Sequence, residues 1–575
     1  MDFVTTLVTD STINDISSEL EYGVKSGASS TTYQSFPASS PSNSSITFSV
    51  QVPSENVIVS RDILLTTGLS FTINIDAGVA VGEYAFNYGQ LDALQAFPLA
   101  SIMTTAQATI NNTTVSLSLQ DILPSLLRMT DERDLMHWNG ATPNMPDKNF
   151  LTYDSQAGDA TNSNVLGSIL NASYDTTLLP RGSHPCKIVI EHYKDDGTYI
   201  DDSAKSADVT DTWKISVQTI VTEPIFLSPF IFGKPTHNCQ GLLGVNNMSF
   251  SFNIDSSLKR LWSATTKGGD YTLTPGISPR VGTANPNLFT NTTMVGLISQ
   301  PSTPTLLLKF LSSQPSQMIK SKNVVPYMDY PRFLTGSANT GSITSLGTAT
   351  LTASNVQLNQ IPDLIIINVR KPMSAQGPHD SSSFFKINSI SVNLNNQSGL
   401  LSSASPVDLW RMSVRNGSNQ SWTEFSGCAN SNNASGAGEL TYTSGSLLII
   451  DPVLDLSLPD YISSGSAGQY NFQFNINVTN QNADTIAPEI CTICCNSGII
   501  VTNQGSTSTY TGMLTKSMVL DAKATKGIST GVNERLIGGK LLNRGLRKSL
   551  RDFVSSVKVG GVLSGASQSK MASFL

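Results

Sequence analysis

One sequence pattern occurs twice in the chain, and this repeat constrains the fold more than any other feature. Residues 108–129 read ATINNTTVSLSLQDILPSLLRM, and residues 391–412 read SVNLNNQSGLLSSASPVDLWRM. Each copy runs from a strand pattern through an Asn-Asn turn and a polar bridge into a short helical segment that ends in Arg-Met. The first Asn of the turn precedes the Arg by 17 residues in one copy and by 16 in the other. Such self-similarity indicates a duplicated structural unit.

Further similar segments flank the two copies in the same order. The paired segments are 48–59 with 355–367, 224–232 with 447–456, and 248–255 with 470–477. The helical segment of the second copy has a start signal, with Ser405 as N-cap, Pro406 as the first helical residue and Asp408 in the first turn. In the first copy Asp121 takes a similar place before Pro124. We therefore expect a duplicated domain.

Each copy has the pattern of a β domain. From Ile46 to about residue 515, short β-type runs alternate with Gly, Pro, Asn and Asp. In residues 69–75, for example, every second side chain is apolar, which is typical of a half-buried strand. Charged residues make up only 13% of the 575 residues. An eight-stranded jelly roll with enlarged loops fits a copy of about 200–250 residues, so the expected fold is all-β, with two tandem jelly rolls and short helices in the loops.

The two copies differ in length after the Arg-Met pair. Arg128 lies 122 residues before Phe250, whereas Arg411 lies 61 residues before Phe472. The first copy therefore holds about sixty extra residues. They fall in turn-rich stretches within residues 130–212, where an exposed insertion is thermodynamically tolerable because closure entropy grows slowly with loop length. We expect large surface loops there.

Several other classes of protein are disfavoured. No apolar run approaches the ~18 residues of a membrane span, and the opening MDFVTTLVTD lacks the basic and apolar regions of a signal peptide. Six cysteines in 575 residues are too sparse for a disulfide scaffold. The sequence Cys491-Thr-Ile-Cys494-Cys495 supplies half of a zinc site at most, and buried thiols in a strand are the favoured interpretation. The five histidines show no ligand spacing, so we expect no metal, no cofactor, no small-molecule substrate and no enzymatic activity.

The sequence resembles the double-jelly-roll major capsid proteins of virophages and polinton-like viruses. The resemblance depends on the order of individually weak segments, of which 392–405 (VNLNNQSGLLSSAS) and 414–427 (VRNGSNQSWTEFSG) are the most specific. The other segments are 31–40, 91–102, 108–112, 178–185, 225–232 and 252–263. The resemblance implies a homotrimer that forms a pseudo-hexagonal block and tiles an icosahedral shell around a DNA genome. It also implies penton and minor capsid proteins as partners, a place in the virion, and assembly inside the host cell.

The C-terminal segment 516–575 differs in charge from the rest of the chain. It holds eleven Lys and Arg against three Asp and Glu, a net charge of +8, whereas the whole chain has −7. Helical periodicity between residues 542 and 558 gathers apolar side chains in one stripe. The opposite side holds the candidate contact residues Lys540, Arg544, Arg547, Lys548, Arg551 and Lys558.

Three roles of this tail remain open. In the first, it forms a helix that packs on its own β body. In the second, it contacts genomic DNA or an internal membrane at the inner face of the shell. In the third, it is a scaffolding or cleaved segment, with the double glycines 538–539 and 560–561 as protease sites. The expected division of the chain is an N-terminal arm (1–45), a first jelly roll (46–300), a second jelly roll (301–515) and the basic tail (516–575).

Two alternative functions fit the same architecture. Tandem jelly rolls also serve as glycan-binding adhesins or spikes, but only 7% of the residues are aromatic. A glycosidase on a jelly-roll scaffold would need two carboxylates about 5–10 Å apart in a cleft. A self-assembling capsid protein is the expected function.

Overall fold

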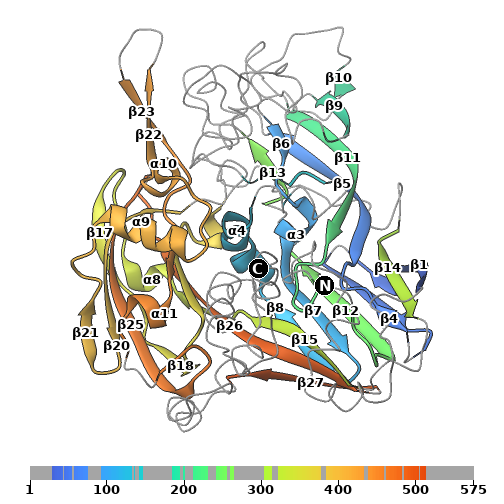
Figure 1. Ribbon diagram of the computed structural model, residues 1–575. Coiled ribbons are helices and arrows are strands. Elements are labelled where there is room, and N and C mark those ends of the chain that lie inside the picture. The colour runs from blue at the N-terminus through green and yellow to red at the C-terminus, as the bar shows by residue number, and fades with distance from the viewer. Residues whose placement is uncertain are drawn as a thin grey trace, which may run out of the picture.

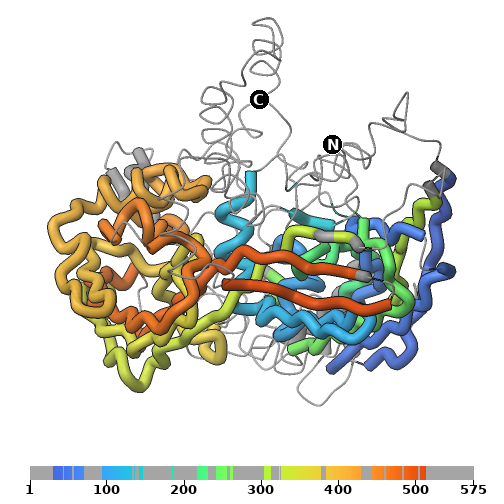
Figure 2. The backbone as a smooth tube through the Cα atoms, turned by 60° about the horizontal axis from the view of Figure 1, so that its bottom comes forward, coloured from blue at the N-terminus to red at the C-terminus, as the bar shows by residue number. Residues whose placement is uncertain are grey.

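The computed structural model describes two β-rich lobes that lie side by side (Figures 1 and 2). It describes residues 29–512 apart from 43, 55–56, 76–91, 132–134, 136–141, 145, 147–183, 185, 194–198, 201–211, 231–240, 256–259, 265–302, 314–321, 377–383, 433–437, 459–461, 482–484 and 504. The expected C-terminal helical tail lies outside the described residues. Among the described helices, none has the length and apolar character to span a membrane.

The first lobe is a sandwich of two antiparallel sheets. One sheet has the order β1 (Ser29–Pro37), β14 (Thr305–Ser313), β5 (Leu64–Ile75), β11 (Thr212–Pro224), β9 (Lys187–Tyr193) and β10 (Tyr199–Ile200), with β4 (Ile58–Val59) also paired to β14. The other has the order β2 (Ser40–Pro41), β3 (Ser45–Gln51), β12 (Asn247–Ile254), β7 (Met103–Ile110) and β8 (Thr113–Leu117). Smaller elements are β6 (Asp92–Leu94) paired with β13 (Trp262–Ala264), and the helices α3 (Pro98–Ile102) and α4 (Leu119–Met129).

Alternating side chains from both sheets fill the space between them. In β3, Ile46, Phe48 and Val50 are buried and the intervening residues are not. From the other sheet, Leu69 and Phe71 of β5 belong to the same hydrophobic cluster. Apolar alternation at a period of two produces such a face because successive side chains of a strand point to opposite sides.

The second lobe repeats this construction. One sheet has the order β15 (Lys322–Asp329), β26 (Glu489–Asn503), β19 (Leu364–Arg370) and β24 (Leu448–Ile450), with β16 (Arg332–Thr335) and β27 (Ser506–Thr511) also paired to β26. The other has the order β17 (Thr348–Thr352), β25 (Ala467–Thr479), β20 (Lys386–Leu394) and β21 (Gln397–Leu400), with β18 (Val356–Gln360) also paired to β25. Shorter elements are the hairpin β22 (Cys428–Asn432) and β23 (Gly438–Tyr442), α8 (Ser337–Thr340), η2 (Met373–Ala375), α9 (Pro406–Arg415), α10 (Trp422–Phe425) and α11 (Pro452–Asp455).

The connectivity of the two lobes confirms the duplication. The order β3-β12-β7-β8 in the first lobe recurs as β18-β25-β20-β21 in the second, and β14-β5-β11 recurs as β26-β19-β24. The turn of the repeat is also built in the same way. Asn111 and Asn395 both have φ 52°, and their side-chain oxygens accept the backbone N–H of Asn246 and Asn471, each at 2.8 Å.

The predicted start of α9 is confirmed. Ser405 is the N-cap, its side chain accepts the N–H of Asp408, and Asp408 in turn accepts the N–H of Ser405, which makes a capping box. Pro406 takes the first helical position. The all-β class with short helices in the loops is confirmed as well.

Two observations bear on the division of the chain. Residues 29–41, which the sequence assigned to an arm, contain β1 and β2, and β1 pairs with β14 along its whole length. The strand β14 itself, which lies beyond residue 300, hydrogen-bonds with β5 of the first lobe. We therefore propose that the first jelly roll extends from residue 29 to residue 313, and that the second begins at β15. Of the predicted surface loops in 130–212, the described parts contain β9 and β10, which extend the first sheet beside β11.

Candidate functional site

The helix α4 lies between the two lobes (Figure 1). It belongs to the first lobe by sequence, but its side chains are buried on all sides. The buried residues of this helix are Leu119, Asp121, Ile122, Leu123, Pro124, Ser125, Leu126, Leu127 and Arg128. A helix that is apolar or buried around its whole circumference is enclosed by protein, so α4 is a central element of the junction between the lobes.

A buried ion network joins α4 to the second lobe. Asp121 pairs with Arg332 of β16 at 2.9 Å and with Arg370 of β19. The guanidinium of Arg370 also pairs with Glu489 of β26, with 2.7 Å between Nε and Oε1. The Arg370 side chain is only 3% exposed. Because removal of one partner would leave an uncompensated buried charge, each member holds the others in place.

The neighbours of Arg370 keep it charged. Burial by itself lowers the pKa of this guanidinium, but Cys491, Asp121 and Glu489 outweigh burial and raise the pKa above its ordinary value. Burial raises the pKa of the Cys491 thiol to about 11, although Arg370 opposes this shift. The junction therefore contains a permanent positive charge between two carboxylates.

Two hydrogen bonds and a cation–π contact complete this side of the junction. The amide of Asn368 donates to the Ser125 hydroxyl at 3.1 Å. The backbone N–H of Asn419 donates to the Arg128 carbonyl at 3.0 Å, and the Arg128 guanidinium lies 4.6 Å from the centre of the Phe384 ring. The C-terminal end of α4 is thereby fixed to loop residues of the second lobe, and its middle to β19.

The long strand β26 connects the lobes on another side. Its first half pairs with β19 in the second lobe, and its second half, with β15 and β27, lies along the first lobe (Figure 2). The Thr507 N–H donates to Asn112 Oδ1 at 2.8 Å, and Asn111 Nδ2 donates to the Thr507 hydroxyl at 2.9 Å. Side chains of both lobes belong to one hydrophobic cluster, with Leu123 and Ile493 as examples. The two lobes consequently form one packed body.

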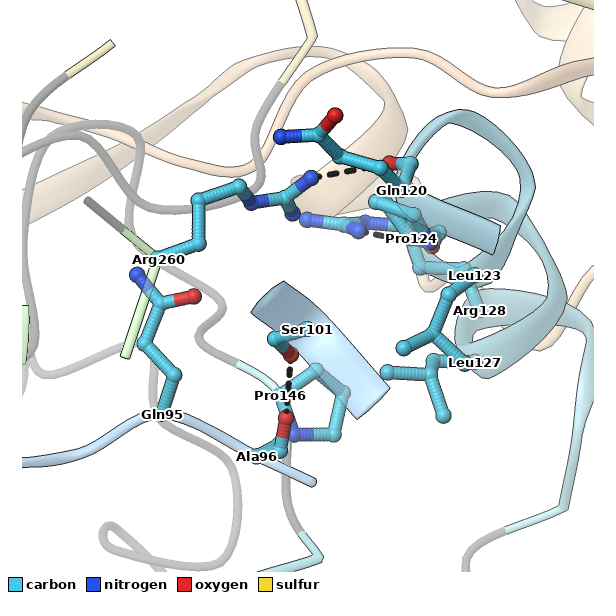
Figure 3. Close-up of a pocket in the computed structure, with 10 residues that line it drawn as sticks. All are labelled: Gln95, Ala96, Ser101, Gln120, Leu123, Pro124, Leu127, Arg128, Pro146 and Arg260. Carbon is cyan, nitrogen blue, oxygen red and sulfur yellow. Dashed lines mark hydrogen bonds between the residues drawn. The ribbon is translucent and has the colours of Figure 1, made fainter. Parts of the chain in front are cut away.

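A cavity beside α4 is too small for a ligand. Gln95, Gln120, Leu127, Arg128 and Arg260 are among the residues that line it (Figure 3), and its volume is about 20 Å³. That volume accommodates a water molecule and nothing larger. Arg260 donates to the Gln120 carbonyl at 2.9 Å. Burial, together with the positive charge of Arg370, lowers the pKa of Arg260 to about 9.

Glu223 of β11 is a buried carboxyl with a structural role. It accepts the backbone N–H groups of Leu99 and Ala100 at 2.8 Å each, and the Thr142 hydroxyl at 3.2 Å. Burial raises the pKa of Glu223 to about 7, although these hydrogen bonds oppose the shift. The carboxyl therefore satisfies donors at the start of α3, where a helix leaves N–H groups unpaired.

The structure places the sequence-predicted candidates as follows. The six basic residues Lys540, Arg544, Arg547, Lys548, Arg551 and Lys558 lie outside the described residues. Cys491, Cys494 and Cys495 are buried free thiols in β26, as predicted. His184 is buried and its Nε2 lies 3.1 Å from the Thr219 hydroxyl. Within the described ranges no group of His, Cys, Asp and Glu has the arrangement of a metal site.

The ion network was not predicted from the sequence. Asp121 entered the sequence analysis only as a helix-start signal, and Arg370 did not enter it. One signal was available, because Arg370 ends the strand LIIINVR, which is apolar except for Asn368, and a charge in such a strand needs a buried partner.

Comparisons with known proteins find relatives of both parts of the chain. The family model for the Sputnik virophage major capsid protein first domain matches residues 1–311, and the model for the major capsid protein V20 C-terminal domain matches residues 330–498. The capsid protein V20 of Sputnik virophage is 26% identical over 560 residues, which cover 95% of this chain and 85% of the relative.

Two solved structures are similar over most of their length. A chain of the Sputnik virophage structure, solved by cryo-EM, superposes with a TM-score of 0.70 at 25% identity, over 90% of this chain and 96% of the other. The crystal structure of the mavirus major capsid protein gives a TM-score of 0.62 at 14% identity, over 85% and 92%. The second likeness concerns the fold alone.

Proposed function

Because the chain belongs to the Sputnik virophage major capsid protein family, we propose that it self-assembles as pseudo-hexagonal homotrimers, which tile an icosahedral shell around a DNA genome. The protein is a capsid structural protein of the virion shell and not an enzyme, and its predicted double-jelly-roll fold is confirmed. The trimer, the tiling and the enclosed genome are the proposed part.

The observation that carries the proposal is the repeated connectivity of two lobes in one packed body. The orders β3-β12-β7-β8 and β14-β5-β11 of the first lobe recur in the second as β18-β25-β20-β21 and β26-β19-β24. Three copies of a chain with two similar lobes present six similar units around a threefold axis, and the differences between the lobes let neighbouring contacts differ. A closed block with six edges tiles a surface, which is what a shell requires.

The trimer has a direct test. Size-exclusion chromatography with light scattering should give a mass three times that of the 575-residue chain. Electron microscopy of the same fraction should show particles with a six-sided outline. A chain that remains monomeric at concentrations well above micromolar would contradict the proposal.

The basic tail is proposed to face the interior of the shell. Its net charge of +8 over residues 516–575 suits contact with genomic DNA or an anionic internal membrane. Deletion of these residues should reduce the nucleic acid retained by assembled particles and weaken the salt dependence of retention. Unchanged retention and salt dependence would dismiss this role.

Penton and minor capsid proteins are the further proposed partners, since a block with six edges does not close a shell at its fivefold vertices.

A further inference from the structure

The two copies of the repeat end in equivalent helices that differ in exposure. α4 follows the hairpin β7–β8 and α9 follows β20–β21, and each helix has an aspartate as its third residue, Asp121 and Asp408. α4 is buried on all sides because it lies between the lobes. In α9 the buried residues are Leu409, Met412 and Ser413, whereas Val407 is 41% exposed. Within the described chain, the outer side of α9 is uncovered.

The sheet face that α4 covers in the second lobe also has an equivalent. This face is formed by β26, β19 and β24, whose outward side chains include Cys491 and Ile493, both fully buried at the junction. The order β26-β19-β24 corresponds to β14-β5-β11 in the first lobe.

Leu307 and Lys309 of β14 point away from the sandwich of the first lobe, as Cys491 and Ile493 of β26 point away from the sandwich of the second lobe. The inward neighbours Leu306 and Leu308 are buried in that sandwich, which agrees with the alternation of a strand.

The outer face of the first lobe is exposed and apolar. We call it the β14 face, and its residues are Tyr33, Ile220, Leu307 and Lys309. Tyr33 is 77% exposed, Ile220 44% and Leu307 39%. Lys309 adds a positive charge, with its Nζ 5.9 Å from the centre of the Tyr33 ring. Large apolar side chains that a sheet leaves exposed on one face are candidates for an interaction surface.

We propose that α9 of one copy of the chain docks on the β14 face of the next copy, in the way that α4 docks on the second lobe within one chain. This inference rests on the proposed trimer and specifies its interface. Each chain then offers a helix at one end and a complementary face at the other. Such a head-to-tail contact closes into a ring when the rotation between copies permits it.

Charge complementarity supports this orientation. Within the chain, Asp121 of α4 pairs with Arg332, and Arg332 is the register partner of Ile493. On the β14 face the positive charge is Lys309, which lies beside its register partner Tyr33. Asp408, the third residue of α9 as Asp121 is the third residue of α4, supplies the complementary negative charge on the helix.

Two substitutions separate the two halves of the interface. Leu307→Asp places a carboxylate on the β14 face, and Val407→Asp places one on α9. Because association would bury an unpaired charge, each should raise the concentration at which trimers dissociate at least about 100-fold. Ile220→Asp is a second variant for the same face. Leu346→Asp is the matched control, since Leu346 is 52% exposed, belongs neither to α9 nor to the β14 face, and has φ 54°, which Asp tolerates.

A mixture of the two variants gives the sharpest result. The Leu307→Asp chain keeps an intact helix and the Val407→Asp chain keeps an intact face, so one interface can form between them and a ring of three cannot. Mass photometry or light scattering should show monomers for each variant alone and one-to-one heterodimers for the mixture. Thermal unfolding and circular dichroism should match the wild type and the control.

The possible outcomes separate this interface from the trimer itself. A monomeric wild type contradicts the trimer and the interface together. A trimeric wild type whose Leu307→Asp, Ile220→Asp and Val407→Asp variants all stay trimeric overturns only the interface. Folded monomeric variants whose mixture yields no heterodimer overturn the pairing of α9 with the β14 face.

Discussion

Arg370 of the second jelly roll forms an ion pair with Asp121 of the first, across 249 residues of sequence. The same guanidinium binds Glu489, so one positive charge is shared by two carboxylates at the centre of the molecule.

Substitution of this arginine should destabilise the whole chain. Arg370→Met leaves Asp121 and Glu489 buried beside each other without their shared counter-charge, and we expect a loss of about 3–5 kcal/mol in unfolding free energy. Arg411→Met is the control, because Arg411 is an exposed residue of α9, and exposed charges contribute about 0–1 kcal/mol to stability. Urea unfolding followed by fluorescence compares the two. Equal losses would contradict the central role of Arg370.

The stability of the chain should depend on pH through Glu223. The pKa of this carboxyl is raised by burial from its ordinary 4.5 to about 7 in the folded state. The folded state therefore binds more protons than the unfolded state between these values. Its contribution to stability is present below pH 4.5 and is lost as pH rises through 7, by about 3 kcal/mol.

Glu223→Gln isolates this effect, since other carboxyls contribute equally to variant and wild type. The difference in unfolding free energy between the two proteins should shift in favour of the variant from pH 4.5 to pH 8. Parallel curves for the two proteins would show that Glu223 does not titrate in this range.

Each of the paired asparagines of the repeat should tolerate glycine better than alanine, and Asn111 should be the more sensitive of the two positions. Both have φ 52°, which alanine adopts only at a cost of about 1–2 kcal/mol, whereas glycine adopts it freely. Asn111→Ala should be more destabilising than Asn395→Ala, because Asn111 also donates to Gly244 and to Thr507 of the second jelly roll. Thermal unfolding of the four variants tests both rankings.

Loss of the α9 cap should have a small, defined effect. Ser405→Ala removes the acceptor of the Asp408 N–H and should lower stability by about 1 kcal/mol. Ser403→Ala, two residues earlier at an exposed position, serves as the comparison and should be neutral. A loss of the same size in both variants would argue against the capping box.

Local patterns explain what could be predicted. The Asn-Asn turn, the cap at Ser405 and the strand alternation each depend on neighbouring residues, so the duplication and the all-β class were visible in the sequence. The strand β1 was missed because its residues 30–35 are exposed on both faces, which leaves no alternation to detect. Its stability as a strand depends on pairing with β14, far along the chain.

The junction could not be predicted for a related reason. Asp121 and Arg370 meet only when both sandwiches have formed and packed, and no periodic signal links residues so distant. The assignment of Cys491, Cys494 and Cys495 to buried thiols succeeded because sparse cysteines in a β-rich run have few alternatives. The six basic tail residues stay a prediction.

The strand β26 has a mechanical consequence. A single segment of 15 residues pairs within the second jelly roll at one end and lies against the first at the other. A continuous hydrogen-bonded strand resists bending far more than a loop does, so the lobes cannot hinge about a linker. The curvature of a closed shell must then arise at the contacts between neighbouring chains, because each chain is itself rigid.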